Sequence, residues 1–138
     1  MAIYDAHSTI FTTTAISPDS YAGDSLQESQ LVDMQGFNSL EYIVNIGLTS
    51  PSTVGNTFTV ELRENDIQDE GSATPVPAQY VLGDASFTGA SLFETRRVGY
   101  VGKKRFVLVR ITPAGNTSSK FGVVSVQGRP IVAATDEN

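Results

Sequence analysis

The sequence of 138 residues contains no cysteine, no tryptophan and a single histidine, His7. Without cysteine there is no disulfide framework, no thiolate metal site and no cysteine nucleophile. With one histidine there is no pair of imidazoles to hold a catalytic zinc ion. A Ser-His-acid site would have to use His7, and the chain has no Gly-x-Ser-x-Gly turn to present the serine. We therefore expect no catalytic residue, no metal and no cofactor, in a protein that is not an enzyme.

Long apolar runs are also missing. No stretch approaches the ~18 apolar residues that cross a bilayer. Residues 1–11 lack the basic and then apolar segments of a signal peptide. No window shows the apolar periodicity of an amphipathic helix. We expect a protein that is made in a cytoplasm, binds no membrane and has helix in under about a tenth of its residues, well below the usual third.

Alternation of apolar and polar residues dominates the chain instead. It is clearest over residues 40–48 and 57–64, where one face of each predicted strand is apolar. Residues 105–112 are apolar on both faces, as in a strand covered on both sides. Residues 120–127 are rich in β-branched side chains and predict a fourth strand. The side chains expected in the core are Tyr42, Val44, Ile46, Phe58, Val60, Leu62, Val107, Val109 and Ile111.

Weaker patterns fill the rest of the chain. We interpret residues 113–119, with proline, glycine and asparagine, as a hairpin loop, and residues 83–94 as a surface connection. Seven or eight short strands predict an all-β, single-domain antiparallel β-sandwich or flattened barrel over residues 1–132, followed by a polar C-terminal tail at 133–138. The weaker predicted strands are 8–16, ended by the turn residues 17–20, then 26–34, 81–82 and 98–101.

The net charge of −6 is unevenly distributed. Residues 1–95 carry 13 of the 15 acidic residues and one base, a charge of −12, whereas residues 96–138 carry +6. Such asymmetry favours an oriented interface, for example between copies of the chain. Alternatively, the two halves mix in space and the charges average out. The sequence leaves both interpretations open.

Five of the nine bases lie within ten residues, with a tyrosine among them. Binding of nucleic acid would use the bases for phosphates and the ring for stacking. The net charge and a pI near 4.6 argue against a nucleic-acid partner. The alternatives are a solvated strand edge, where lysine discourages aggregation, and an interface with an acidic protein surface. The candidate interface residues are Arg96, Arg97, Tyr100, Lys103, Lys104 and Arg105.

The segment Glu64–Gly71 is the acidic counterpart of this cluster. Several oxygens close together are typical of calcium sites, but the spacing does not match an EF-hand loop. We interpret the segment as a solvated hairpin tip, whose acids could also meet the basic cluster of a neighbouring copy. The candidate residues are Asp66, Asp69 and Glu70.

Three runs in the chain share a pattern with a known group of proteins. They are Val32–Leu40, Arg97–Thr112 (RVGYVGKKRFVLVRIT) and Val123–Pro130 (VVSVQGRP). Together they resemble a group of small structural proteins of tailed bacteriophages and prophages, which carry a Gly-Tyr-x-Gly-x-(Lys/Arg)-Arg-(Tyr/Phe)-Val-Arg-Val strand and end near Gly-x-Pro. Here Leu108 and Val109 precede the last arginine of the pattern. The resemblance covers roughly residues 31–132 and carries over no set of functional residues.

The resemblance implies a virion structural protein, made in the host cytoplasm. Within that class we expect a capsid decoration or cement protein on the outer surface of the head shell. Its partners would be the major capsid protein and copies of itself, as a homotrimer, because shells offer local threefold positions. The alternatives are a tail or head-completion component, a receptor- or glycan-binding fibre domain, and a small carbohydrate hydrolase, although the missing tryptophan weighs against the last.

Overall fold

The structure is a computed structural model that describes residues 6–115 and 118–129. Strands account for 57% of the described residues and helices for 8%, which confirms the expected all-β class. The helices are α1 (Ala6–Thr9) and two 3-10 turns, η1 (Glu70–Ser72) and η2 (Ala78–Tyr80). The longer strands are β1 (Ile10–Ala22), β4 (Ser39–Ser50), β5 (Thr57–Asn65), β9 (Thr95–Tyr100), β10 (Phe106–Ala114) and β11 (Ser118–Gly128). The two-residue strands are β2 (Gln27–Glu28), β3 (Val32–Asp33), β6 (Thr74–Pro75), β7 (Val81–Leu82) and β8 (Phe87–Thr88).

The four strongest strand predictions correspond to β4, β5, β10 and β11. The described residues form 11 strands instead of seven or eight, because five strands are only two residues long. Patterns of period two cannot be detected over two residues. The polar tail expected at 133–138 lies outside the described residues.

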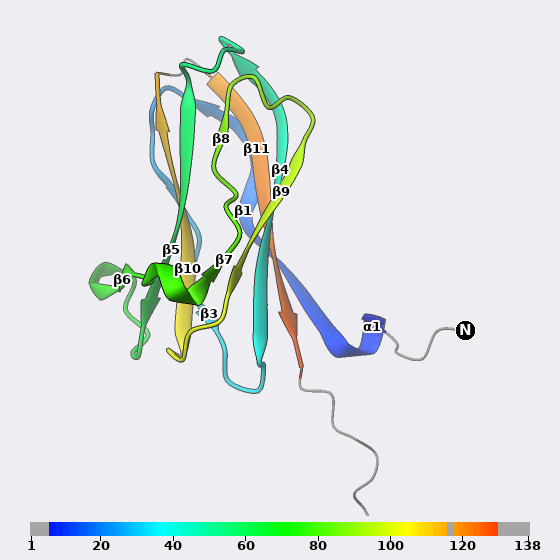
Figure 1. The fold of residues 1–138 in the computed structure, drawn as a ribbon, viewed down its shortest axis with the longest axis vertical. Helices are drawn as coiled ribbons and strands as arrows, with labels where there is room; N and C mark the ends of the chain where they lie inside the picture. Colours follow the sequence, from blue (N-terminus) through cyan, green and yellow to red (C-terminus); the bar gives the residue numbers. More distant parts are fainter. Residues whose placement is uncertain (1–5, 116–117, 130–138) are drawn as a thin grey trace, which may run out of the picture.

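Two antiparallel sheets face each other as a sandwich (Figure 1). One has the order β1-β11-β4-β9-β7, and the other β2-β10-β5-β6, with β3 beside β10 and β8 beside β5. Successive long strands change sheet, from β4 to β5 and from β9 through β10 to β11. If β2 and β3 count as one edge position of the six-stranded sheet, and β6 and β8 as the other, the connectivity is that of a jelly roll, which consists of two interleaved Greek keys.

The predicted hairpin over residues 113–119 is wrong. β10 pairs with β5, and β11 pairs with β1 and β4, so the connection crosses from one sheet to the other. Gly115 has a φ of 80°, a left-handed conformation that favours glycine. Turn residues mark a reversal of the chain, but they do not specify which sheet the returning strand joins.

β1 is longer than predicted. The sequence predicts that this strand ends at residues 17–20, yet it pairs with β11 as far as Ala22. Register shifts on either side of Ile16 accommodate Pro18, which is tolerated because β1 is an edge strand. Residues 26–34 differ in the opposite direction. The sequence predicts one strand there, but only the two-residue strands β2 and β3 form, and both pair with β10.

The core lies between the sheets. Of the nine side chains expected there, all except Val60 are buried. Val60 is half-buried because it lines a hollow of about 480 Å³ beside the short strand β7. The predicted surface connection at 83–94 is partly wrong, since Ala85 and Phe87 are buried and Phe87 stacks on Phe58 with ring centroids 4.4 Å apart.

The outer face of β10 is covered as well, as its sequence predicted. Leu108, which points away from the inter-sheet core, has no exposed surface. A hollow of about 520 Å³ outside the sheet is lined by Gln30 and Leu31 together with residues 68–71. The acidic segment therefore folds toward the β2–β3 connection and is not an isolated hairpin tip.

Candidate functional site

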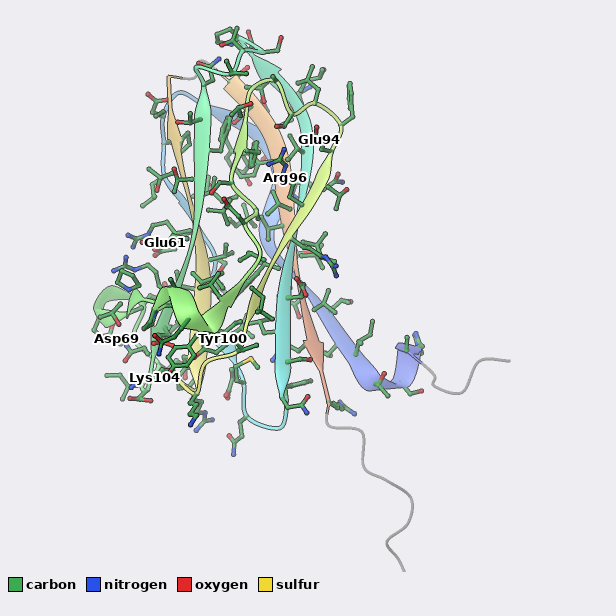
Figure 2. All side chains as sticks on the ribbon, viewed as in Figure 1. Glu61, Asp69, Glu94, Arg96, Tyr100 and Lys104 are labelled. Carbon is green, nitrogen blue, oxygen red and sulfur yellow. The ribbon has the colours of Figure 1, made fainter. Side chains whose placement is uncertain are left out.

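The five clustered bases do not form one surface patch. Arg96 and Arg97 are neighbours in β9 and point to opposite faces of the sheet. The Arg96 guanidinium donates to the Ser86 carbonyl oxygen at 2.8 Å and pairs with Glu94 at 3.0 Å. Arg97 lies on the outer face, opposite Ile43. Figure 2 shows Arg96 well separated from Lys104, which lies at the other end of the sandwich.

Tyr100 is a core residue, and its side chain leaves almost no surface on which a base could stack. Its side chain is 3% exposed. The hydroxyl donates to Glu64 Oε2 at 2.7 Å and accepts from the Lys104 backbone N–H at 2.9 Å. Burial raises the pKa of this hydroxyl above its ordinary range, and the hydrogen bond to Glu64 raises it further. A Cβ at position 102 would overlap the Tyr100 hydroxyl, so Gly102 is required for this arrangement.

Lys104 and Arg105 are engaged within the chain. Lys104 pairs with Asp66. Arg105 donates to both carboxylate oxygens of Asp33, each at 2.9 Å. The hydrogen bonds from Arg105, more than any other contact, lower the pKa of Asp33 to about 2. These pairs hold the β9–β10 connection against the residues that precede β4 and follow β5.

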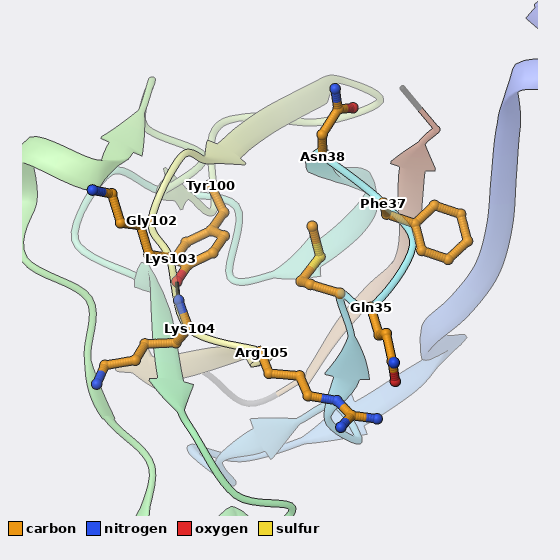
Figure 3. A pocket seen from close by; sticks show the side chains of 9 residues that line it. Gln35, Phe37, Asn38, Tyr100, Gly102, Lys103, Lys104 and Arg105 are labelled. Carbon is orange, nitrogen blue, oxygen red and sulfur yellow. Dashed lines mark hydrogen bonds between the residues drawn. The ribbon is translucent and has the colours of Figure 1, made fainter. Parts of the chain in front are cut away.

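A hollow of about 420 Å³ opens beside this connection (Figure 3). One wall is the β3–β4 loop and the other is the β9–β10 connection. Figure 3 shows the Phe37 ring pointing away from the hollow, and this ring packs against Phe11 with ring centroids 6.0 Å apart. The side chains of Lys103 and Lys104 point away from the β3–β4 loop in the same view. Lys103 is exposed and makes no ion pair among the described residues. The cationic hollow, as we call it, is lined by Met34, Gln35, Phe37, Asn38, Tyr100, Gly102, Lys103, Lys104 and Arg105.

The acidic segment is ordered by its own contacts. Asp69 caps η1, where its carboxylate accepts from the Gly71 N–H at 3.1 Å. Asp66 pairs with Lys104 of the same chain, and Glu70 is exposed. No group of three or more histidine, aspartate or glutamate side chains that could hold a metal ion occurs among residues 6–115 and 118–129.

The charged halves of the sequence mix in space. Four of the five ion pairs in the described residues join an acid of residues 1–95 to a base of residues 96–138. The averaging interpretation therefore fits the structure better than two faces of opposite charge. Arg97 and Lys103 remain as bases of the cluster without an acidic partner in this part of the chain.

Another hollow, which the sequence does not predict, lies on the outer face of the five-stranded sheet. It has a volume of about 640 Å³ and is lined by Pro18, Asp19, Asn45, Lys120 and Phe93, among others. Phe93 is 75% exposed and has a φ of 58°, a left-handed conformation that costs a bulky residue about 1–3 kcal/mol. No pattern in the sequence distinguishes this exposed ring from a core aromatic.

Comparisons with known proteins identify the fold only. No family model matches the chain, and no curated protein matches it. Among solved structures, the PBSX exported protein XepA is similar over 99% of this chain and 43% of its own, with a TM-score of 0.64 and 9% sequence identity. The chain thus spans less than half the length of XepA.

Two further similarities are weaker. The CBM22-1–GH10 modules of the Clostridium thermocellum xylanase 10B cover 80% of this chain and 20% of their own, with a TM-score of 0.44 and 14% identity. The structure of the infectious bursal disease virus Gx strain covers 87% of this chain and 32% of its own, with a TM-score of 0.43 and 12% identity. Both scores are too low to bear on function. Within the described residues, no helix has the length and apolar character needed to cross a membrane.

Proposed function

We propose that the protein is a structural component of a phage virion that decorates the outer surface of the head shell. The observation that carries the proposal is the likeness in fold to XepA over 99% of this chain, a protein of the phage PBSX. The resemblance of residues 97–112 and 123–130 to small phage structural proteins supports it independently. The proposal assigns the protein a binding role and no catalytic one.

The cationic hollow supplies a contact surface for an acidic patch of the major capsid protein. Lys103 lies at the hollow and has no ion-pair partner in the described residues, and Met34 supplies apolar surface to the hollow. Exposed ion pairs are each worth only about 0–1 kcal/mol. In this proposal charge therefore steers and orients the protein, and apolar contacts retain it.

The test is reloading of purified protein onto particles that lack it, across a series of salt concentrations. Lys103→Glu should load more slowly than wild type at low salt, and the difference should shrink as salt screens the charges. Arg97→Glu is the matched control, because Arg97 is an exposed base on the outer face of β9, outside the hollow and without an ion pair among the described residues. Equal loading of Lys103→Glu and wild type would remove the cationic hollow from the proposal. If wild type fails to load at any salt concentration, the proposed decoration role is wrong.

Copy number separates decoration from a tail or head-completion role. A decoration protein should be present in hundreds of copies per particle and a connector or fibre in about a dozen or fewer, as closed symmetric assemblies require. A stained gel of purified particles, with the band quantified against the major capsid protein, distinguishes the two.

One observation favours a second candidate, the glycan-binding fibre domain. The hollow at Phe93 combines an exposed ring with an amide, a carboxylate and an ammonium group, from Asn45, Asp19 and Lys120. Apolar surface with a few polar groups is the usual composition of a ligand site. Saturation-transfer NMR with hexaoses of glucose and of mannose tests this candidate. Transfer that is lost in Phe93→Ala would support it, and no transfer to either sugar would count against it.

A further inference from the structure

The edges of the two sheets differ sharply in length. The six-stranded sheet ends in β2 and β3 on one side and in β6 and β8 on the other, all of two residues. The five-stranded sheet ends in the two-residue β7 at one side and in β1, which has 13 residues, at the other. Very short edge strands are a common protection against pairing with another chain. β1 is therefore the one long edge strand in the described part of the molecule, and Figure 1 shows no strand beyond it.

Only the second half of β1 carries features that oppose strand pairing. The register shifts on either side of Ile16, together with Pro18, disturb the ladder there. The first half, Ile10–Thr14, pairs with β11 without a shift and contains no charge and no proline. Ile10 is 43% exposed and Phe11 is 50% exposed. On the side away from β11, the backbone of this half has no hydrogen-bond partner among the described residues.

We propose that Ile10–Thr14 pairs with the same segment of a second copy, antiparallel and across a twofold axis. Centred on Thr12, this pairing places Ile10 opposite Thr14 and Phe11 opposite Thr13. The faces agree, because Phe11 shares a face of the sheet with Gln127 and Thr12 shares the other face with Val126. Aromatic and β-branched pairs and Thr–Thr pairs are favourable across antiparallel strands.

Charge favours a second copy as the occupant of this edge. Like charges that meet directly across a strand pair are destabilising, and a twofold axis places each charge near its own copy. Residues 8–16 contain no charged side chain, so the edge meets itself without repulsion. The five-stranded sheets of the two copies would then join into one continuous sheet.

This contact closes on itself. A single free edge makes an isologous contact, which produces a twofold dimer and leaves no further edge of the same kind. Pairing through β1 therefore cannot build the homotrimer expected from the sequence, which would need a different surface. The inference does not rest on the decoration role, because the contact is between copies of this chain alone.

Cross-linking tests the register directly. The chain has no cysteine, so Thr12→Cys introduces one thiol. Opposed residues of antiparallel strands have Cα atoms about 4.5–5.5 Å apart, within the range that a disulfide spans. Mild oxidation should convert Thr12→Cys into a covalent dimer. Thr59→Cys is the control, an exposed threonine on β5 in the other sheet, and it should remain monomeric under denaturing conditions.

Sedimentation velocity over a range of concentrations provides the second measurement. Wild type and Thr59→Lys should sediment as dimers, whereas Thr12→Lys should sediment as a monomer with an unchanged far-UV CD spectrum. Amide exchange at residues 10–14 should slow as the wild-type concentration rises. A wild type that is monomeric throughout would overturn the proposal, as would a Thr12→Lys variant that still dimerises.

Discussion

Removal of the Tyr100 hydroxyl should destabilise the protein more than the loss of an ordinary hydrogen bond. In Tyr100→Phe the ring keeps its place in the core, and only the contacts of the hydroxyl are lost. Those contacts are the bond to Glu64 Oε2 at 2.7 Å and the bond from the Lys104 N–H at 2.9 Å. Glu64 is 8% exposed, and the Tyr100 hydroxyl is the donor that the described residues provide to its carboxylate.

The magnitude follows from the burial of Glu64. A hydrogen bond to a charged group contributes about 1.5–3 kcal/mol, whereas a neutral one contributes about 0.5–1.5 kcal/mol. Deletion of the hydroxyl leaves a buried carboxylate without its donor and the Lys104 N–H without its acceptor. We therefore expect Tyr100→Phe to lower the free energy of unfolding by about 1.5–3 kcal/mol.

Urea unfolding at neutral pH is the assay, with a double-mutant cycle as its control. In a Glu64→Gln background the acceptor at position 64 is neutral, so Tyr100→Phe should cost only the ~0.5–1.5 kcal/mol of a neutral bond. A change within about 0.5 kcal/mol in the wild-type background, typical of surface substitutions, would refute the reasoning. An equal cost in both backgrounds would show that the charge of Glu64 does not contribute.

Three further predictions follow from burial and charge. Because burial raises the pKa of Tyr100, the stability that this hydroxyl contributes is present below about pH 10 and is lost as pH rises further. The difference in urea midpoint between wild type and Tyr100→Phe should therefore shrink at alkaline pH. Asp33, with its pKa lowered to about 2, stabilises the folded state above about pH 4 and loses that effect as pH falls toward 2. Asp33→Asn should therefore reduce the loss of folding stability in acid, by a small amount because the pair with Arg105 is half-exposed. Val109 has no exposed surface, so Val109→Ala should lower the free energy of unfolding by about 1–3 kcal/mol. An unchanged melting temperature would contradict the place of Val109 in the core.

Long strands could be predicted from the sequence because their alternation reports burial directly. Residues 40–48 and 57–64 show one buried face, and 105–112 shows two, and each pattern matches the environment of β4, β5 and β10. Sheet membership could not be predicted in this way. Gly115 and its neighbours reverse the chain equally well within one sheet or between two.

Proximity in sequence was a poor guide to proximity on the surface. Arg96 and Arg97 diverge because successive side chains of a strand point to opposite faces. Phe87 and Phe93 lie in one segment rich in glycine, serine and alanine, yet one is 3% exposed and the other 75%. The difference arises from the pairing of β8 with β5, a tertiary contact that no local pattern records.

The Gly-Tyr-x-Gly pattern illustrates how a motif can belong to the fold and not to a site. Gly102 leaves room for the Tyr100 hydroxyl, which in turn binds the backbone of Lys104 and the carboxylate of Glu64. The motif thus ties the β9–β10 connection to the end of β5.

Two ion pairs, one in β10 and one just before it, also belong to the fold and not to a site. Arg110 lies directly opposite Glu28 of β2 and pairs with it, and Arg105 binds Asp33 of β3. Exposed pairs of this kind contribute little stability, but opposite charges that face each other across two strands favour one register over its alternatives. The Arg110–Glu28 pair therefore favours the observed register of β10 and β2. Lys103, which has no acidic partner in the described residues, and the uncharged edge of β1 are the surfaces that the two proposals assign to partners.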